Sequence, residues 1–347
     1  MKIYLRLFLI VFANLISACG NQSRLAVNPP YPSSPVIEGI TWDFANVVRL
    51  AAGSDLWPTT WADDDNIYTS WGDGGGFSGT NSDGRVSLGF ARIEGQPEDF
   101  VAYNVWGGKD PENPATFGGK CGGIISVDGV LYARINMQNG NPPDINLAWS
   151  SDHGRSWQIA DWGFPEDNFF PSTFLNFGRD YAGARDNHIY IYGGPWGSGV
   201  NHYLVRVPKD QIRNRPSYEF FRGLDADGNP LWTLNITERH PVMVDPNGIR
   251  NIVSVFYNPG IKRYLASTSH GGVGQLSIFD APEPWGPWTV LAYYDNWGSF
   301  GSGEALVYSF PTKWISADGR IMWMVFSSTG KLDSFNLIKV TLTPKMS

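Results

Sequence analysis

Five similar segments recur along the chain, each joining an apolar run to a short polar turn and then to a strand headed by an aromatic residue. These aromatics stand 64, 58, 74 and 59 residues apart, at Tyr68, Tyr132, Tyr190, Tyr264 and Trp323. Each segment is typical of a β-hairpin, and a third strand-like stretch follows every one. Antiparallel units at this spacing are typical of propeller blades. The sequence therefore predicts an all-β fold, a five-bladed β-propeller.

The two ends of the chain are expected to close the ring. The fifth unit ends at the C-terminus with its third strand, VTLT, and so lacks an outer strand. Residues 40–50, ITWDFANVVRL, precede the first hairpin and have no other partner. We expect this N-terminal strand to complete the last blade and to protect its edge.

The first residues predict export. Residues 1–18 hold an apolar stretch that begins beside the basic residues Lys2 and Arg6 and is too short to span a bilayer, as in a signal peptide. The small residues before Cys19 are similar to a bacterial lipobox, which implies lipidation of that thiol. Residues 19–36 are polar and proline-rich, as in a tether, and 37–347 are expected to form a single propeller domain. We expect a protein held to a bacterial membrane by lipid alone, in the periplasm or on the cell surface; an ordinary secretory signal is the alternative.

The amino-acid composition indicates which classes of partner the protein can bind. Cys121 is the only cysteine besides Cys19, so a lipidated chain can form no internal disulfide. A net charge of −7 without a basic run argues against nucleic acid. The 15 Trp, 15 Tyr and 40 Gly fit a glycine-turned β-fold with aromatic surfaces for flat ligands. We expect a monomer that binds carbohydrate.

One face of a propeller collects the candidate site residues. In a four-stranded blade numbered from the axis outward, the loops that enter strand one and join strands two and three lie on one face, here called the pocket face. The hairpin turns lie on the other, the turn face. This division places on the pocket face residues from several blades, namely Asp55, Trp57, Asp73, Lys120, Asp180, Trp196, Arg239, His240, His270 and Glu304.

Four of these are candidate catalytic carboxyls, because glycosidic cleavage needs a proton donor and a second carboxylate. Asp55 is the first choice, since it stands just before the innermost strand of the first blade. Asp73 is flanked by glycines that let backbone approach a ligand. Glu304 is the candidate acid and Asp180 the reserve. For each one, a plain turn or surface role is the alternative.

The remaining residues are candidates for substrate binding. Lys120, Arg239, His240 and His270 could orient sugar hydroxyls or a substrate carboxylate. Trp57 and Trp196 offer flat apolar faces for a sugar ring. Burial between blades is the alternative for either Trp, and a solvated or hydrogen-bonded role is the alternative for each basic residue.

Other polar signals are expected on the turn face. Asp63, Asp64 and Asp65 lie in a hairpin turn, where solvated carboxylates are common. Residues 150–157, SSDHGRSW, match the sialidase Asp-box, whose aspartate binds turn amides and whose Trp wedges into the blade. The sequence has no HExxH, no paired CxxC and no Asp-rich calcium loop. We therefore expect no cofactor and no dedicated metal site, and nothing in the sequence supports an axial calcium ion.

The strings DLWPTTWADDDNIYTSWGDG, GGIISVDGVLYARI, SDHGRSW and FPTKWISADGRIMWMVFSS resemble exported bacterial proteins of the domain of unknown function family 4185, a propeller family linked to glycan degradation. The place of Asp55 is more distantly similar to five-bladed furanosidases such as glycoside hydrolase family 43, where acids from separate blades meet at the axis. That likeness implies that Asp55 is the base or nucleophile. Glu304 departs from it, since that family's acid comes from the middle of the ring. Sialidases match less well, because they use six blades, repeated Asp-boxes and an arginine triad.

Three functions remain open on the sequence. The first is an exported glycoside hydrolase that acts on an oligosaccharide or polysaccharide, furanoside-containing polymers among them, by carboxylate acid/base chemistry. The second is a non-catalytic glycan-binding lipoprotein that uses the same cup and the Trp platforms. The third is a polysaccharide lyase, in which Lys, His or Tyr beside a uronic acid replaces the carboxylate pair.

Overall fold

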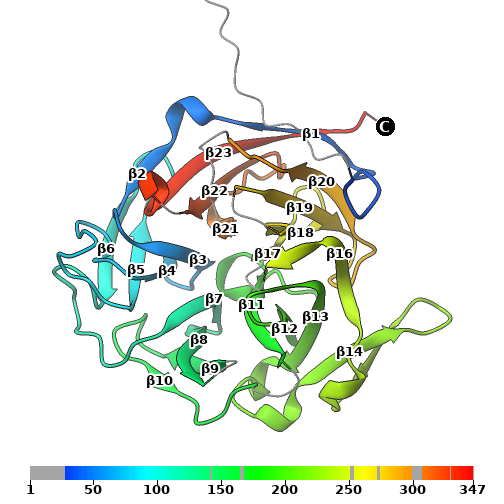
Figure 1. The fold of residues 1–347 in the computed structure, drawn as a ribbon, viewed down its shortest axis with the longest axis horizontal. Coiled ribbons are helices and arrows are strands. Elements are labelled where there is room, and N and C mark those ends of the chain that lie inside the picture. The colour runs from blue at the N-terminus through cyan, green and yellow to red at the C-terminus, as the bar shows by residue number, and fades with distance from the viewer. Residues whose placement is uncertain are drawn as a thin grey trace, which may run out of the picture.

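The structure, a computed structural model, describes residues 28–140, 143–164, 168–250, 254–271, 274–298, 307–328 and 330–346. Strands and short 3-10 turns make up its regular elements, and these described segments include no α-helix. Nor is any helix among them long and apolar enough to cross a membrane. The strands form groups arranged around a common centre (Figure 1), so the predicted all-β propeller is confirmed.

Within the described residues the strands fall into five groups, which we call blades 1 to 5. Blade 1 is a four-stranded sheet ordered β3 (Asp55–Trp61), β4 (Ile67–Gly72), β5 (Leu88–Glu94) and β6 (Val101–Trp106). Blade 2 is built in the same way from β7 (Lys120–Val127), β8 (Val130–Gly140), β9 (Pro143–Ser150) and β10 (Gln158–Ile159). Blade 4 contains β17 (Ser254–Asn258), β18 (Arg263–Thr268), β19 (Leu276–Ala281) and β20 (Thr289–Tyr294).

Blade 3 is the largest. It contains β11 (Phe170–Asn176), β12 (His188–Gly194), β13 (Ser198–Pro208), β14 (Glu219–Leu224) and β15 (Pro230–Thr233). An additional strand, β16 (Pro241–Arg250), pairs with the first half of β13, and β14 pairs with its second half. A short parallel contact between β11 and β17 joins blades 3 and 4 into one ten-stranded sheet.

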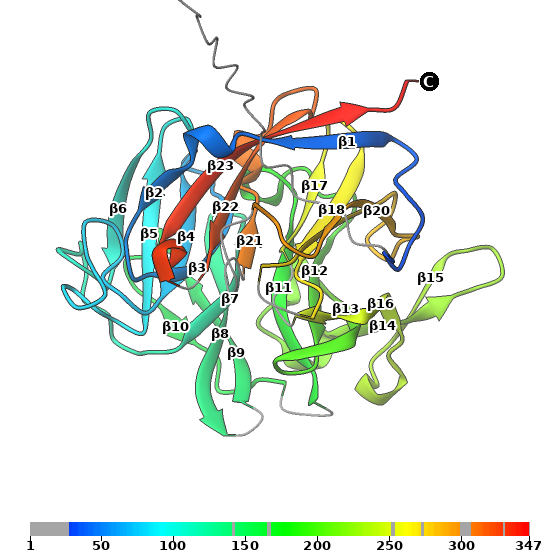
Figure 2. The same cartoon turned by 45° about the horizontal axis from the view of Figure 1, so that its top comes forward.

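Both ends of the described chain meet in blade 5, whose core strands are β21 (Val307–Ser309), β22 (Ile321–Ser327) and β23 (Phe335–Pro344). The N-terminal segment supplies β1 (Ile37–Trp42) and β2 (Val48–Leu50), and both pair antiparallel with β23 (Figure 2). The predicted place of this segment at the edge of the last blade is therefore confirmed. A 3-10 turn at Phe44–Asn46 divides it into two strands where one was predicted.

The end of the predicted tether is part of the folded structure. Ser34 is fully buried, and its backbone N donates to Val290 O of β20 at 2.8 Å. The ring of Tyr31 packs edge-on against Phe279, with the ring centroids 5.6 Å apart. The prediction of a free tether up to residue 36 is therefore wrong for these residues, because apolar and backbone contacts hold them on blade 4.

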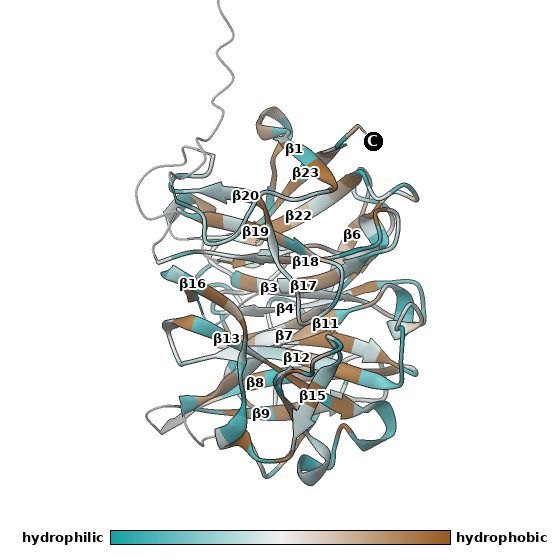
Figure 3. Cartoon of the chain, turned by 90° about the vertical axis from the view of Figure 1, so that its right-hand side faces the viewer, coloured by the Kyte–Doolittle hydropathy of each residue, from teal (hydrophilic) through white to brown (hydrophobic). Residues whose placement is uncertain are grey.

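The middle strands of the blades are buried on both faces because neighbouring blades cover them. All six residues of β4 are buried, as are those of β18 and β19. Figure 3 shows hydrophobic positions along the strands and hydrophilic ones in many of the connections. This burial stabilises the fold mainly because it removes apolar surface from water.

The Asp-box has the structural role predicted for it. The Asp152 carboxylate accepts hydrogen bonds from Ser156 N at 2.9 Å and from the hydroxyls of Ser156 and Ser150 at 2.6 and 2.7 Å. The Trp157 indole donates to Gly154 O at 3.0 Å and stacks on Phe90 of blade 1, with centroids 4.0 Å apart. The motif therefore closes the β9–β10 turn and joins blade 2 to blade 1.

We expect Asp152→Ala to lower the free energy of unfolding by about 1 to 3 kcal/mol, because three donors lose their acceptor. Burial opposes ionisation of Asp152, but the Ser156 and Ser150 hydrogen bonds outweigh it and lower the pKa. The contribution is therefore lost as pH falls through that lowered pKa. Urea unfolding at neutral and acidic pH measures both effects, with the exposed Asp161→Ala as control. An equal loss in both variants would contradict this role.

Candidate active site

The propeller axis is too narrow for a sugar. The inner strands of all five blades line it, with Pro58, Gly123, Thr173, Ser254 and Ser309 among the lining residues. The cavity between them has a volume of about 20 Å³. That space holds roughly one water molecule. A sugar therefore cannot bind between these inner strands and must bind outside them, where the loops lie.

On the pocket face a charged cluster forms beside this mouth, from residues of three blades. Asp55 begins β3 and Asp73 directly follows β4, both in blade 1. Lys120 begins β7 of blade 2. Arg85 lies in the loop between β4 and β5, and Asp333 lies between η8 (Gly330–Leu332) and β23 of blade 5. The structure thus brings together three predicted residues, Asp55, Asp73 and Lys120, and adds two that sequence reasoning missed.

Asp55 is half-buried in the cluster, and one of its carboxyl oxygens is enclosed. Desolvation raises its pKa to about 6; the Lys120 ammonium opposes this shift, and the charges of Asp73 and Asp333 add to it. Its Oδ1 atom is buried and has no hydrogen-bond partner among the described residues. A carboxyl in such surroundings can hold a proton close to neutral pH, which is what a general acid requires.

The charges around Asp55 are held by ion pairs. Asp73 Oδ1 lies 2.6 Å from Lys120 Nζ and 3.2 Å from Arg85 Nη2. Burial, together with the charge of Asp73, raises the pKa of Asp333. The cluster therefore combines three carboxyls with two cations, so it can both carry a proton and stabilise negative charge.

Glycines give the cluster its close packing. Asp73 has a left-handed backbone with φ of 57°, and Gly74 follows with φ of 65°. A Cβ atom on Gly74 would lie 2.2 Å from Gly53 O, so no other residue fits there without movement. The glycine-flanked loop predicted to let backbone approach a ligand instead lets the loops of blade 1 approach each other.

Gly72 is the contact point between Asp55 and Lys120. A Cβ atom there would lie 2.8 Å from Asp55 Oδ1 and 2.9 Å from Lys120 Cδ. We expect Gly72→Ala to displace both side chains and, for the hydrolase activity proposed below, to lower kcat/KM roughly tenfold to a hundredfold, since a displacement of about 1 Å can cost that much. The matched control is Gly39→Ala, whose Cβ would meet nothing closer than 3.9 Å. Equal kcat/KM in the two variants would show that this packing does not matter.

Trp57 does not form a sugar platform. Its side chain is fully buried, its indole N donates to Ser54 O at 2.9 Å, and it stacks on Trp71 with centroids 5.7 Å apart. Leu56 and Trp57 both have positive φ, and the β3–β4 register shifts between Leu56 and Thr59. This irregularity turns the indole into the core between blades 1 and 5, so the prediction of substrate binding by Trp57 is wrong.

Asp180 lies on the turn face, not on the pocket face. It belongs to η3 (Arg179–Tyr181), within the connection between β11 and β12. Its Oδ1 accepts from Ser126 Oγ at 2.7 Å and from Gly129 N at 3.1 Å, in the β7–β8 turn of blade 2. The predicted placement is wrong because residues 178–186 are a hairpin connection between the first two strands of blade 3.

Arg239 and His240 lie at the outer edge of blade 3. The Arg239 guanidinium lies 5.1 Å from the ring centroid of Phe169 and 4.5 Å from that of Tyr203. His240 N donates to Phe221 O of β14 at 2.8 Å. They were predicted on the pocket face but lie outside its charged cluster, because β16, which follows them, pairs with β13 in blade 3.

His270 lies in the predicted β18–β19 loop but outside the charged cluster. It is buried, stacked on Tyr293 with centroids 3.7 Å apart, and within 2.6 Å of Ser277 Oγ and 3.2 Å of Asp295 Oδ1. Burial lowers its pKa, although Asp295 opposes this.

Trp196, in the β12–β13 loop, is 42% exposed and packs on Phe170 with centroids 4.8 Å apart, so its indole is available to a ligand. Glu304 lies outside the described residues.

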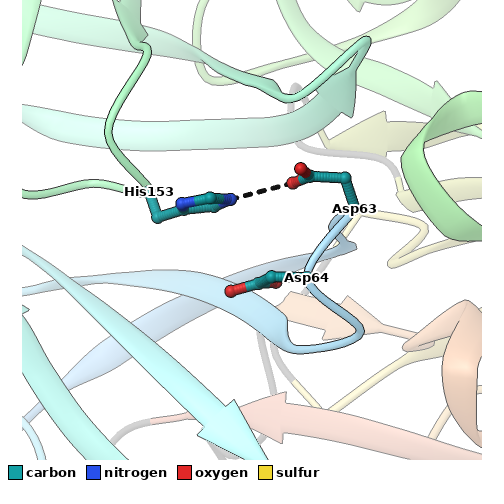
Figure 4. A group of neighbouring side chains, drawn as sticks. All are labelled: Asp63, Asp64 and His153. Atoms are coloured by element: carbon teal, nitrogen blue, oxygen red, sulfur yellow. Dashed lines mark hydrogen bonds and ion pairs between the residues drawn. The ribbon is translucent and has the colours of Figure 1, made fainter.

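On the turn face, Asp63, Asp64 and His153 come together (Figure 4), with ligand atoms all within 4.8 Å of one another. His153 Nε2 lies 2.9 Å from Asp63 Oδ1, which links the Asp-box turn of blade 2 to the β3–β4 turn of blade 1. Asp64 accepts from the Tyr68 hydroxyl at 2.8 Å. The predicted hairpin turn is confirmed, and hydrogen bonds within the group account for its arrangement.

Comparison with known proteins supports this fold. The sequence profile of the family described as "Domain of unknown function (DUF4185)" matches residues 123–299, slightly more than half of the chain. The match spans blades 2 to 4 and includes none of the five cluster residues. No curated protein matches the sequence significantly.

Solved structures with a similar fold include glycoside hydrolases. The RS223 β-xylosidase has a TM-score of 0.52 at 13% identity over 87% of this chain and 98% of its own. A GH43_1 enzyme from Xanthomonas citri has a TM-score of 0.53 at 11% identity over 87% and 93%. CoXyl43, a GH43 β-xylosidase/α-arabinofuranosidase from a compost microbial metagenome crystallised with xylotriose, has a TM-score of 0.52 at 12% identity over 92% and 98%. At these identities the likeness concerns the fold.

Proposed function

We propose that this chain, which belongs to the DUF4185 family, is a glycoside hydrolase in which Asp55 carries the reacting proton. The observation that supports this most is the gathering of one buried, protonatable carboxyl, two further carboxyls and two cations from three blades at the mouth of the axis. Enzymes of similar fold are named as β-xylosidases and arabinofuranosidases, which supports a carbohydrate substrate. Furanoside-containing polymers are therefore the first substrates to test.

The chemistry follows from the different surroundings of the carboxyls. Desolvation raises the pKa of Asp55 to about 6, which favours a general acid that protonates the leaving oxygen. This role differs from the base or nucleophile that the likeness to family 43 implied. Asp73 is the proposed second carboxylate, since its side chain is 41% exposed and can reach a bound sugar. Lys120 and Arg85 would stabilise the negative charge of Asp73 and orient substrate hydroxyls.

The direct test is turnover by the mature domain on a panel of furanoside and pyranoside polymers, with reducing ends and product anomers followed by NMR. The proposal predicts new reducing ends and a kcat/KM that depends on an ionisation near pH 6. A non-catalytic binding protein would retain the glycan without releasing products. A polysaccharide lyase would release unsaturated products that absorb in the ultraviolet. Either outcome would contradict hydrolysis.

Export and lipidation are a further part of the proposal. Cys19 follows small residues at the end of the apolar stretch, and Cys121 is fully buried in blade 2. We expect Cys19→Ser to lose incorporation of labelled fatty acid and to move from the membrane to the soluble fraction, since the thiol is the acyl acceptor. Cys121→Ser is the matched control and should remain in the membrane fraction. Unchanged labelling in Cys19→Ser would contradict lipidation.

A further inference from the structure

A groove runs beside the candidate site between blades 1 and 5. It has a volume of about 560 Å³, and its lining includes residues of β2 and β6. These two strands are neighbours at the outer side of the ring (Figure 1). Phe77, Leu50 and Val101 give it an apolar surface; Leu50 is 42% and Val101 51% exposed. Apolar surface of this kind suits the C–H faces of sugar rings. The groove is therefore large enough for a sugar ring and chemically suited to one.

The groove and the charged cluster are built from the same loops. Ala51 and Ala52 line the groove, and Asp55 follows them in the chain. Phe77, Ser78 and Gly79 lie in the loop that also carries Asp73 and Arg85. Lys331 and Ser334 line the groove on either side of Asp333, whose backbone O accepts from Gly53 N. The loops that hold the charged cluster therefore also line the groove.

The charged side chains that line the groove are positive. Arg49 and Lys331 are among its lining residues, and no carboxylate is among them. Both side chains are exposed, and neither forms an ion pair or a side-chain hydrogen bond with another described residue. Two unpaired cations in a protein of net charge −7 favour a ligand that brings its own negative charge.

From these observations we infer that the groove between blades 1 and 5 is a subsite for an anionic sugar residue of the same glycan whose bond is cleaved at the Asp55 cluster. A carboxylate or sulfate on that sugar would lie between Arg49 and Lys331 while its ring covers Leu50 and Val101. This inference rests on the proposed function for the position of the reacting bond, but the binding it predicts is measured separately.

The test uses the Asp55→Asn variant, so that bound glycan is not consumed, and titrates it by calorimetry with oligogalacturonate, a sulfated oligosaccharide and a neutral arabino-oligosaccharide of equal length. In this background, Arg49→Gln with Lys331→Gln should weaken binding of one or both anionic oligomers roughly fivefold to tenfold, since each exposed ion pair contributes up to about 1 kcal/mol. Binding of the neutral oligomer should stay unchanged. Added salt should weaken binding of the anionic oligomers less in this triple variant than in Asp55→Asn alone.

A charge-matched control separates a local from a general effect. Lys262→Gln with Lys345→Gln changes the net charge equally at exposed positions outside the groove and should leave anionic binding unchanged. Equal losses in the two double variants, or no preference for anionic over neutral oligomers, would overturn the inference and leave hydrolysis unaffected. Charge-dependent binding by a wild-type protein that cleaves no glycan would instead contradict the proposed function and support the subsite.

Discussion

Replacement of Asp55 by Asn is expected to lower kcat/KM by about a hundredfold to ten-thousandfold, the usual cost of losing a general acid or base. The amide keeps the size of the side chain but cannot transfer the proton. The measurement is the initial rate on the best polymer from the substrate panel, with wild type and variant compared at pH 6. Asp295→Asn is the matched control, because Asp295 is a carboxylate in blade 4 that contacts His270 outside the cluster. Equal rates for wild type and Asp55→Asn would remove Asp55 from the mechanism.

The same variant should be more stable than wild type. Because desolvation raises the folded-state pKa of Asp55 from 3.8 to about 6, ionisation of this carboxyl costs stability once the pH exceeds 3.8. The cost grows up to about pH 6 and is constant above it. At pH 7 we expect Asp55→Asn to raise the free energy of unfolding by about 2 to 3 kcal/mol, and at pH 4 by far less. If the stability gain of Asp55→Asn over wild type were smaller at pH 7 than at pH 4, the result would contradict the burial of this carboxyl.

Replacement of Trp57 by Ala should have the largest effect on stability. The indole is fully buried against Trp71, Phe77 and Phe335, so its removal leaves a cavity between blades 1 and 5. We expect the free energy of unfolding to fall by about 3 to 5 kcal/mol in urea or thermal unfolding.

Trp196→Ala is the matched control, since that indole is 42% exposed. It should lose little stability but weaken glycan binding. The opposite pattern, with Trp57→Ala folded normally and defective only in binding, would restore the platform role that sequence analysis assigned to Trp57.

The fold could be predicted because its signal is periodic. Five aromatic-headed strands at similar spacing require repeated units, and the missing outer strand of the last unit left one place for the N-terminal segment. Asp55, Asp73 and Lys120 were found because each adjoins a strand end on the pocket face. Asp333 occupies the same connection in blade 5 as Asp73 does in blade 1, so the same rule could have found it.

The wrong predictions have local structural causes that the periodicity of the sequence does not reveal. Trp57 is turned inward by two residues with positive φ inside a strand, which alternation cannot predict. Arg239 and His240 follow an additional hairpin, β14 and β15, which the periodicity does not predict. The sequence pattern therefore assigns them to the pocket face, although they lie at the outer edge of blade 3. Asp180 lies in a long connection between β11 and β12 that the sequence pattern assigns to the pocket face, although it lies on the turn face. Arg85 lies in the β4–β5 loop shortly before Leu88, and no sequence pattern marks it.

Loops of three blades enclose the Asp55 carboxyl among other charges, so that it holds a proton near neutral pH. The measurement that tests this most directly is a ¹³C NMR titration of the aspartate carboxyl carbons, with the resonance of Asp55 assigned by its absence from Asp55→Asn. The account predicts a titration midpoint of about 6. A midpoint at or below the ordinary aspartate value of about 3.9 would contradict it.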